Sequence, residues 1–376
     1  MRGRAPCIDW LRKAVVHVKR KRFPKELAAA CAVNAAVAGA AFSSGREVAT
    51  FFTVAGWASW IAIAVAAGLF GVLMGMICHF AIETGAKNLP GIYYKKLDER
   101  CGDAMAVVHA LLMLMMGAVA LSTAGELGML SMDGGSAQFV SAGLALAVAL
   151  LFTYRGMRPL AALGVVITPV FILFFLALAL DPRPTRTGAY LSEATFDMRG
   201  NIPVAIVLGT LFAFLKAAMV GGVAAARSQG LRAARFGVAC GGILAVMAAC
   251  LNGALQRGGR ELWSLSLPAV VLSARWGVAG YYICVYIMWL GCAAVLACAL
   301  GSIMALASRA ASRPACALLT VAAIALMSTT GLKSLVGVGY PMLGWICAIS
   351  LGALAAFYER RKVHAAPTLL LKGSGS

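Results

Sequence analysis

Long apolar stretches follow one another along most of this chain, separated by short polar segments. Hydropathy places ten of them at residues 26–55, 56–82, 104–130, 138–154, 160–180, 202–226, 234–256, 277–307, 314–331 and 335–357. About 20 apolar residues in a helix cross the hydrocarbon core of a bilayer. With 61% hydrophobic and 12% charged residues, the composition excludes a soluble domain. The expected fold class is therefore all-α, a polytopic membrane protein with ten transmembrane helices.

The basic residues lie in every second connecting segment, which gives the expected orientation. With the N-terminus inside, the inner segments carry Lys87, Lys95, Lys96, Arg100, Arg155, Arg158, Arg227, Arg232, Arg235, Arg309, Arg313, Arg360, Arg361 and Lys362. Cytoplasmic segments of membrane proteins carry such an excess of Lys and Arg. We therefore expect a multi-pass protein of a cytoplasmic (inner) membrane, with both termini in the cytoplasm. Because the net charge of +19 is spread over these segments, nucleic acid is not an expected partner.

The same pattern divides the chain into two halves and two tails. We expect a basic cytoplasmic tail at 1–25, a first five-helix repeat at 26–180 and an extracellular linker at 181–201. A second five-helix repeat at 202–357 and a cytoplasmic tail at 358–376 follow. The basic N-terminal tail is expected to contact anionic lipids, and the terminal Gly-Ser-Gly-Ser looks like an engineered addition.

Five spans in each half imply that the second half inserts with the opposite polarity. Transporters with inverted repeats are built in this way. In such a repeat the sixth span mirrors the first, so an irregularity in one predicts an irregularity in the other. Lys216, followed by Gly221-Gly222, lies near the middle of the sixth span. We expect the irregularity of that span there.

Residues 39–47, Gly-Ala-Ala-Phe-Ser-Ser-Gly-Arg-Glu, interrupt the first apolar stretch. Lipid offers no hydrogen-bond partners, so a helix break at membrane depth is tolerated only inside protein or beside a wet cavity. Transporters use the freed N–H and C=O groups of such breaks to hold a substrate or an ion. A loop between two short helices is the alternative, but residues 28–42 are short for a full span. The sequence therefore favours a discontinuous first helix.

The predicted substrate-binding residues surround this break. They are Gly39, Ala40, Phe42, Ser43, Ser44 and Gly45, together with Phe212 of the sixth span. The two serine hydroxyls have two possible roles. They can donate to a solute carboxylate, or they can satisfy carbonyl groups of the break itself.

Three ionisable residues within or beside the spans are assigned to coupling: Glu47, Lys216 and Glu126. A charged side chain at membrane depth is costly unless it is paired or hydrated. Lys216 is expected to pair with Glu47 or with Glu126. A buried lysine that titrates can couple proton movement to transport, and a static ion pair between two helices is the alternative. Glu47 can also cap the half-helix that follows the break.

Metal, cofactor and catalytic signatures are missing from the sequence. The 11 cysteines stand singly and no histidine lies at ligand spacing from them, so neither a metal site nor a disulfide framework is expected. Nucleotide-binding loops and catalytic triads are missing too. We expect no cofactor, and neither an enzyme nor a primary pump.

The first span resembles that of the YkvI-type bacterial membrane proteins. Residues 39–48 followed by Phe51-Phe52 and Gly56 are similar to the family pattern Gly-Ala-Gly-Phe-Ala-Ser-Gly-Gln/Arg-Glu-Ile, then Phe-Phe and Gly. Residues 116–128 and 340–344 resemble its third and last spans more loosely. The family sits in the amino acid–polyamine–organocation superfamily, whose members share the LeuT-type fold. The resemblance implies a 5+5 inverted repeat with discontinuous helices 1 and 6.

Two departures from the family bear on the coupling ion. Lys216 stands where the family tends to have an asparagine after a Tyr-rich stretch. Residues 289–294 lack the threonines of the eighth span, and in sodium-coupled relatives hydroxyls of that helix help to hold a cation. The resemblance with these departures implies proton-coupled or cation-independent transport through Lys216.

The leading hypothesis is a secondary active transporter of a small amino acid-like or amine solute, working by alternating access. The alternative is a transporter-like receptor, or the membrane subunit of a complex, that binds a ligand without translocating it. A channel is a third reading, against which a buried charge pair argues. The expected partners are a small-molecule solute and the lipid bilayer, with the oligomeric state open.

Overall fold

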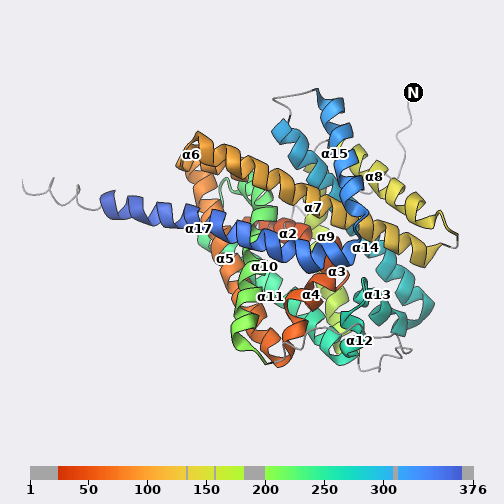
Figure 1. The fold of residues 1–376 in the computed structure, drawn as a ribbon. Helices are drawn as coiled ribbons and strands as arrows, with labels where there is room; N and C mark the ends of the chain where they lie inside the picture. The colour runs from red at the N-terminus through yellow and green to blue at the C-terminus, as the bar shows by residue number, and fades with distance from the viewer. Residues whose placement is uncertain (1–23, 133, 156–157, 182–199, 308–311, 366–376) are drawn as a thin grey trace, which may run out of the picture.

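The computed structural model describes residues 24–132, 134–155, 158–181, 200–307 and 312–365. The basic tail, most of the 181–201 linker and the Gly-Ser end lie outside these residues, and so does the expected contact with anionic lipids. The regular secondary structure of the described residues is helical (Figure 1). The all-α prediction is therefore confirmed.

Long apolar helices make up most of the molecule. Among the described residues, seven helical stretches are long and apolar enough to cross a membrane, and 164–180 and 314–328 are shorter apolar helices. The main helices are α5 (Ser59–Thr84), α7 (Glu99–Ser131), α8 (Ala137–Arg155), α9 (Arg158–Leu180), α10 (Ile202–Arg227), α11 (Ala233–Gly258), α14 (Gly277–Ala307), α15 (Arg313–Ser328) and α17 (Tyr340–Ala365), and the two shorter stretches belong to α9 and α15. From the length and composition of these helices, the protein is a multi-pass membrane protein.

The first apolar stretch is divided into short helices. They are α2 (Lys25–Val37), α3 (Ala40–Ser43) and α4 (Arg46–Phe51), followed by a 3-10 turn, η1 (Thr53–Ala58), that leads into α5. Gly45 has φ of +85°, a conformation that residues with a Cβ adopt only at a cost. The first helix is thus discontinuous, as the sequence predicts.

Helix α10 corrects the matching prediction for the sixth span. It runs without interruption through 26 residues, including Lys216 and Gly221-Gly222. A Cβ at Gly221 would meet the apolar side chains of Leu89 and Ile77 at 3.2 and 3.3 Å. Backbone groups released there would have no polar partner, and an unpaired buried amide costs several times what a glycine costs a helix. The helix therefore keeps its internal hydrogen bonds.

The long helices pack as two groups. In one group α5 packs against α10 and α11, and α2 packs against α11; in the other, α7 and α14 pack against each other and both contact α8 and α15. Helix α9 contacts α2 and α11, and α17 contacts α10. Figure 1 shows α5, α10 and α11 running together on one side, with α8, α14 and α15 on the other. The broken first segment lies between the groups, because its α2 and α4 contact α11 whereas its α3 contacts α7 and α14.

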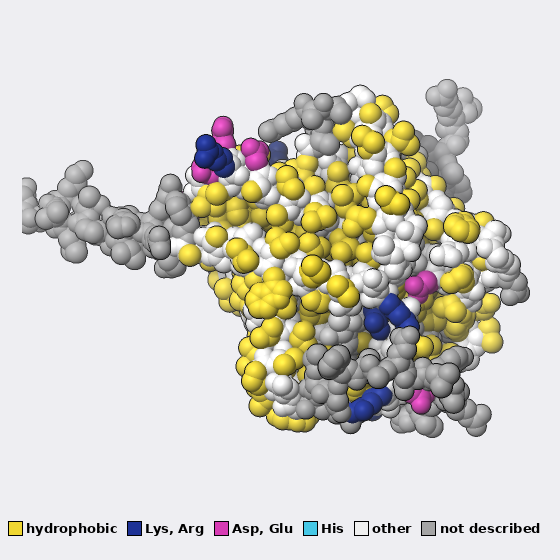
Figure 2. All heavy atoms as spheres, viewed as in Figure 1, with side chains coloured by type: hydrophobic (Ala, Val, Ile, Leu, Met, Phe, Trp, Pro, Cys, Tyr) yellow, Lys and Arg dark blue, Asp and Glu magenta, His cyan; other side chains and the backbone are white. Residues whose placement is uncertain are grey.

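The two ends of the helices differ in what connects them. One end, here called the basic end, carries α6 (Leu89–Lys96), Lys87 and Arg227. Asp98 caps α7 there, and the hydrogen bond from the Cys101 N–H lowers the pKa of its carboxyl group. The opposite end, here called the α12 end, carries η1, α12 (Arg260–Trp263) and α13 (Pro268–Ser273). In the view of Figure 2, charged side chains gather near these ends, and the surface between them is largely hydrophobic.

Candidate functional site

The broken first segment turns twice. Helix α2 ends at Val37, and Gly39, with φ of −53° and ψ of −173°, directs the chain into the single turn of α3. The left-handed Gly45 then starts α4. All the predicted residues of this segment, Gly39 to Gly45, are buried. The packing around them decides what the break can do.

Aromatic side chains fill the space beside the break. The Phe42 ring lies 6.0 Å from Phe175 and 6.3 Å from Phe212, between ring centroids. Phe51 and Phe52 contact Phe212 at 5.5 and 4.9 Å. The five rings are wholly buried. In this conformation the predicted residues Phe42 and Phe212 therefore contact other aromatic rings.

The serines of the break bind its own backbone. Ser43 Oγ donates to the Ala40 carbonyl at 3.2 Å, and Ser44 Oγ donates to the Ala41 carbonyl at 2.9 Å. The Ser44 carbonyl accepts a hydrogen bond of 2.8 Å from the N–H of Ala269, at the start of α13. Of the two roles considered for these hydroxyls, the structure shows the second, in which they satisfy carbonyl groups of the break.

Lys216 and Glu47 form a buried ion pair between α10 and α4. Lys216 Nζ lies 2.7 Å from each oxygen of the Glu47 carboxylate. The ammonium group also lies 5.6 Å from the centre of the Phe212 ring and 5.5 Å from that of Tyr340, within the range of a cation–π interaction. Lys216 is 4% exposed and Glu47 is 1% exposed, so the pair is shielded from solvent. Tyr340 was not among the predicted site residues, although its motif was noted.

Glu126 lies in a different part of the molecule from this pair. Its carboxylate is close to Ser266, Lys333 and Arg46. Arg46 Nη1 donates to the carbonyl groups of Trp263 and Leu265 at 2.8 and 3.4 Å. These contacts tie the start of α4 to the segment that joins α12 to α13. Glu126 therefore belongs to the α12 end, and only Glu47 meets Lys216.

A buried polar network fixes the turn after α4. Asn252 of α11 donates to Ser59 Oγ at 2.9 Å and accepts from Thr53 Oγ1 at 2.9 Å. Gln256 donates to Ser59 Oγ and to the Gly56 carbonyl, both at 2.7 Å. One of these bonds satisfies the Gly56 carbonyl of η1, and the others join the side chains of α11 to Thr53 and Ser59. Together with the contacts of Ser44 and Arg46, they close the α12 end over the break.

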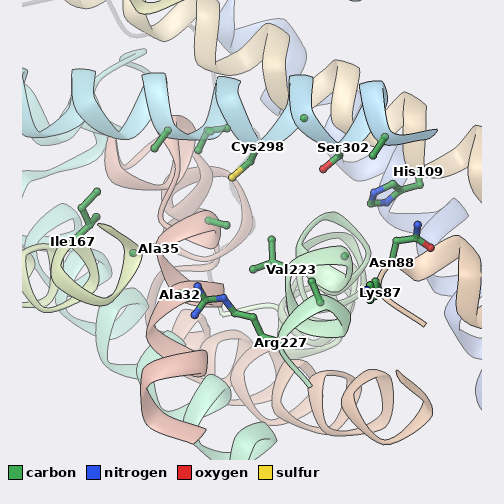
Figure 3. A pocket seen from close by; sticks show the side chains of 18 of the residues that line it. Ala32, Ala35, Lys87, Asn88, His109, Ile167, Val223, Arg227, Cys298 and Ser302 are labelled. Atoms are coloured by element: carbon green, nitrogen blue, oxygen red, sulfur yellow. The ribbon is translucent and has the colours of Figure 1, made fainter. Parts of the chain in front are cut away.

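A cavity of about 340 Å³ lies on the other side of the break, toward the basic end (Figure 3). Its walls come from α2, α7, α9, α10 and α14, and none of the seven predicted substrate-binding residues lines it. Val295, which does line it, has Cγ2 only 2.5 Å from where a Cβ of Gly39 would lie. The Val295 side chain thus lies between the cavity and the first turn of the break.

The charged groups of this cavity were not predicted as site residues. Lys87, Arg227 and His109 line it, and the sequence signal for the first two was only that of a basic connecting segment. Among the described residues, no group of three or more His, Cys, Asp or Glu side chains is placed to hold a metal ion.

Solved structures show that this arrangement of helices is a membrane-transporter fold. Mhp1, a nucleobase-cation-symport-1 family transporter solved in a closed conformation with bromovinylhydantoin bound, superposes with a TM-score of 0.58. That alignment covers 88% of this chain and 76% of Mhp1 at 17% identity. A manganese transporter of Eremococcus coleocola gives a TM-score of 0.55 at 13% identity, with 89% of this chain and 87% of that one covered. Both are transporters and not enzymes, in agreement with the sequence prediction.

A curated relative carries the name of the family that the first span resembles. The uncharacterized membrane protein YkvI of Bacillus subtilis (strain 168) is 27% identical over 147 residues. The match covers 39% of this chain and 41% of that protein, so less than half of either is aligned. No protein-family model matches the chain.

Proposed function

We propose that the protein is a secondary active transporter of a small amino acid-like or amine solute, working by alternating access. The observation that carries this proposal is the first segment, broken twice and placed between two helix groups of a transporter fold. On one side of the break the α12 end is closed by hydrogen bonds, and on the other side a cavity reaches the Gly39–Val295 contact. A carrier that is open toward one side only would have this form.

The LeuT-type 5+5 repeat and the membership of the YkvI-type family are part of the proposal. The broken first segment, the seven long apolar stretches and the two shorter ones would together make ten spans. The separation of the α5, α10, α11 group from the α7, α8, α14, α15 group supports two units that rock against each other. By the positive-inside rule the basic end would lie on the cytoplasmic side of a bacterial inner membrane, and the cavity would then face the cytoplasm.

Coupling is proposed to act through Lys216 and Glu47. Because the Lys216 ammonium already provides a positive charge beside the break, a bound sodium ion is not needed there. Transport would then be proton-coupled, if the pair exchanges a proton, or cation-independent, if the pair stays ionised. Glu126, close to Arg46, would contribute by holding the α12 end closed. Gly39, Ala40, Phe42, Ser43, Ser44, Gly45 and Phe212 would contact the solute once the aromatic rings part.

Measurements of solute binding and uptake by the purified, reconstituted protein test this proposal. A thermal-stabilisation screen of amino acids and amines selects a solute, whose uptake into proteoliposomes is then measured with a pH gradient, a sodium gradient or neither. We expect uptake that ignores sodium and that is lost in Lys216→Gln but kept in Lys95→Gln, an exposed lysine of α6. The melting curve of each variant shows whether it is folded. Uptake driven by sodium would contradict the coupling proposal.

The second candidate function is a receptor or complex subunit that binds without translocating. The filling of the break by Phe42, Phe51, Phe52, Phe175 and Phe212 favours it, because solute passage requires these rings to move. Counterflow separates the two candidates. A solute that stabilises the protein but shows no exchange across the liposome membrane would support the receptor.

A further inference from the structure

The cavity at the basic end is charged with one sign only. Lys87 and Arg227 line it, together with His109, and no Asp or Glu is among the described residues that line it. Within the described part of the chain, neither Lys87 nor Arg227 forms an ion pair. Basic side chains without carboxylate partners around one cavity attract an anion.

Arg227 is placed to meet such an anion. It is partly buried at the end of α10, and in Figure 3 its side chain extends from that helix toward Ala32 of α2. Lys87 is exposed, so it lies where the cavity meets solvent. A guanidinium group binds a carboxylate with two parallel hydrogen bonds, whereas an ammonium group acts as a point charge. Arg227 therefore suits direct contact, and Lys87 suits attraction at the opening.

His109 adds a buried polar atom that lacks a partner. The side chain is 3% exposed, it lines the cavity, and its Nδ1 accepts or donates no hydrogen bond among the described residues. The ring lies beside the Ala218 carbonyl and 3.7 Å from where a Cβ of Gly222 would lie. Nδ1 itself has almost no accessible surface, so a solute in this cavity meets the His109 ring and not this nitrogen.

Apart from Asn88 and Ser302, the rest of the wall is largely apolar. Ala32, Ala35, Ile167, Val223 and Leu306 form much of it, and Figure 3 shows Ala35 and Ile167 away from the His109 side of the cavity. A volume of about 340 Å³ lies at the lower end of the range for small-molecule sites. The cavity thus fits a small solute that has an apolar body and one anionic group.

We propose that this cavity is a binding site for small carboxylates with an apolar body, in which Arg227 contacts the carboxylate and Lys87 attracts it at the opening. The inference rests on the proposed function in taking the cavity as the path of the solute. It selects amino acid-like solutes over amines, because a simple amine would face Arg227 and Lys87 with no carboxylate to offset their charge.

Three matched probes test the site in detergent, without any transport step. Leucine and 4-methylpentanoate carry the carboxylate, and leucinamide carries the amine without it. We expect both carboxylates to raise the melting temperature in a saturable manner and leucinamide to leave it unchanged. Arg227→Gln should weaken the apparent affinity for both carboxylates about tenfold or more, since a charge-assisted hydrogen bond is lost.

Gly222 supplies a matched pair of variants. Gly222→Leu places a side chain against His109 inside the cavity and should abolish the carboxylate effect, whereas Gly222→Ala makes only an ordinary contact and should keep it. Stabilisation by leucinamide alone, an equal effect of chloride, or carboxylate binding unchanged in both Arg227→Gln and Gly222→Leu would overturn the proposal. Carboxylate binding without uptake would contradict the transporter and leave this site standing. Uptake of an amine without carboxylate binding would contradict this site and leave the transporter standing.

Discussion

The broken first segment and helix α10 cross the same core and meet at the Lys216–Glu47 pair. Both contain glycines, but only the first segment leaves the helical conformation at them. Gly39 and Gly45 lie at turns, whereas Gly221 and Gly222 lie inside an unbroken helix. The difference is in the neighbours. At the first segment the Ala269 N–H and two serine hydroxyls bind carbonyl groups of the break, whereas Gly221 faces leucine and isoleucine. A glycine permits a break, and a polar neighbour makes it stable.

Removing the ion pair that joins the two regions is expected to have the largest effect. Lys216→Met leaves the Glu47 carboxylate buried without its partner and should lower the free energy of unfolding by about 3–5 kcal/mol. Adding Glu47→Gln removes the unpaired charge, so the double variant should recover at least half of the loss. Denaturant titration in detergent micelles measures both. A double variant as unstable as the single one would show that the pair is held for reasons other than charge.

Gly45→Ala tests whether the second turn needs glycine. At φ of +85° a residue with a Cβ is strained by roughly 1–2 kcal/mol, and the new Cβ would lie 3.0 Å from Pro268 Cγ. We expect a loss of stability of that size in the same titration. A variant as stable as the native protein would mean that the turn relaxes to a negative φ.

Gly222→Ala provides the contrast in α10 and should have the smallest effect, with the opposite sign. The residue is helical, and a Cβ there would meet only His109 at 3.7 Å. Replacing glycine by alanine inside a helix is favourable by up to about 1 kcal/mol. The variant should therefore unfold at equal or higher denaturant concentration. A clear loss of stability would show that α10 bends at this glycine in some part of its cycle.

The sequence was sufficient for the helical class and for the first break. Uninterrupted apolar stretches force helices in lipid, and Gly39 and Gly45 with two serines between them mark a chain that leaves the helix. The sequence also placed Lys216 at a depth where it needs a partner. The sequence did not show whether Glu47 or Glu126 is the partner of Lys216. That choice depends on which helices pack together, and Glu47 lies 169 positions from Lys216 along the chain.

The cavity and the intact α10 depend on information that is not local. The cavity exists because small residues such as Ala32, Gly164 and Gly291 from separate helices face one another, and hydropathy ranks such residues by polarity and not by size. The continuity of α10 depends on Leu89 and Ile77, which lie more than 130 positions earlier in the chain. The symmetry expected between the two halves of the chain does not predict which side chains surround Gly221.

Val295 lines the cavity and contacts the chain at Gly39, where the first helix is broken. Because glycine has no side chain, the valine methyl group lies directly on the backbone at the point where α2 ends. Turning a valine about χ1 away from its preferred rotamer costs on the order of 1 kcal/mol. Rotation of this one isopropyl group would therefore extend the cavity to the Gly39 backbone, while the packed rings of Phe42, Phe175 and Phe212 would still lie beside the break.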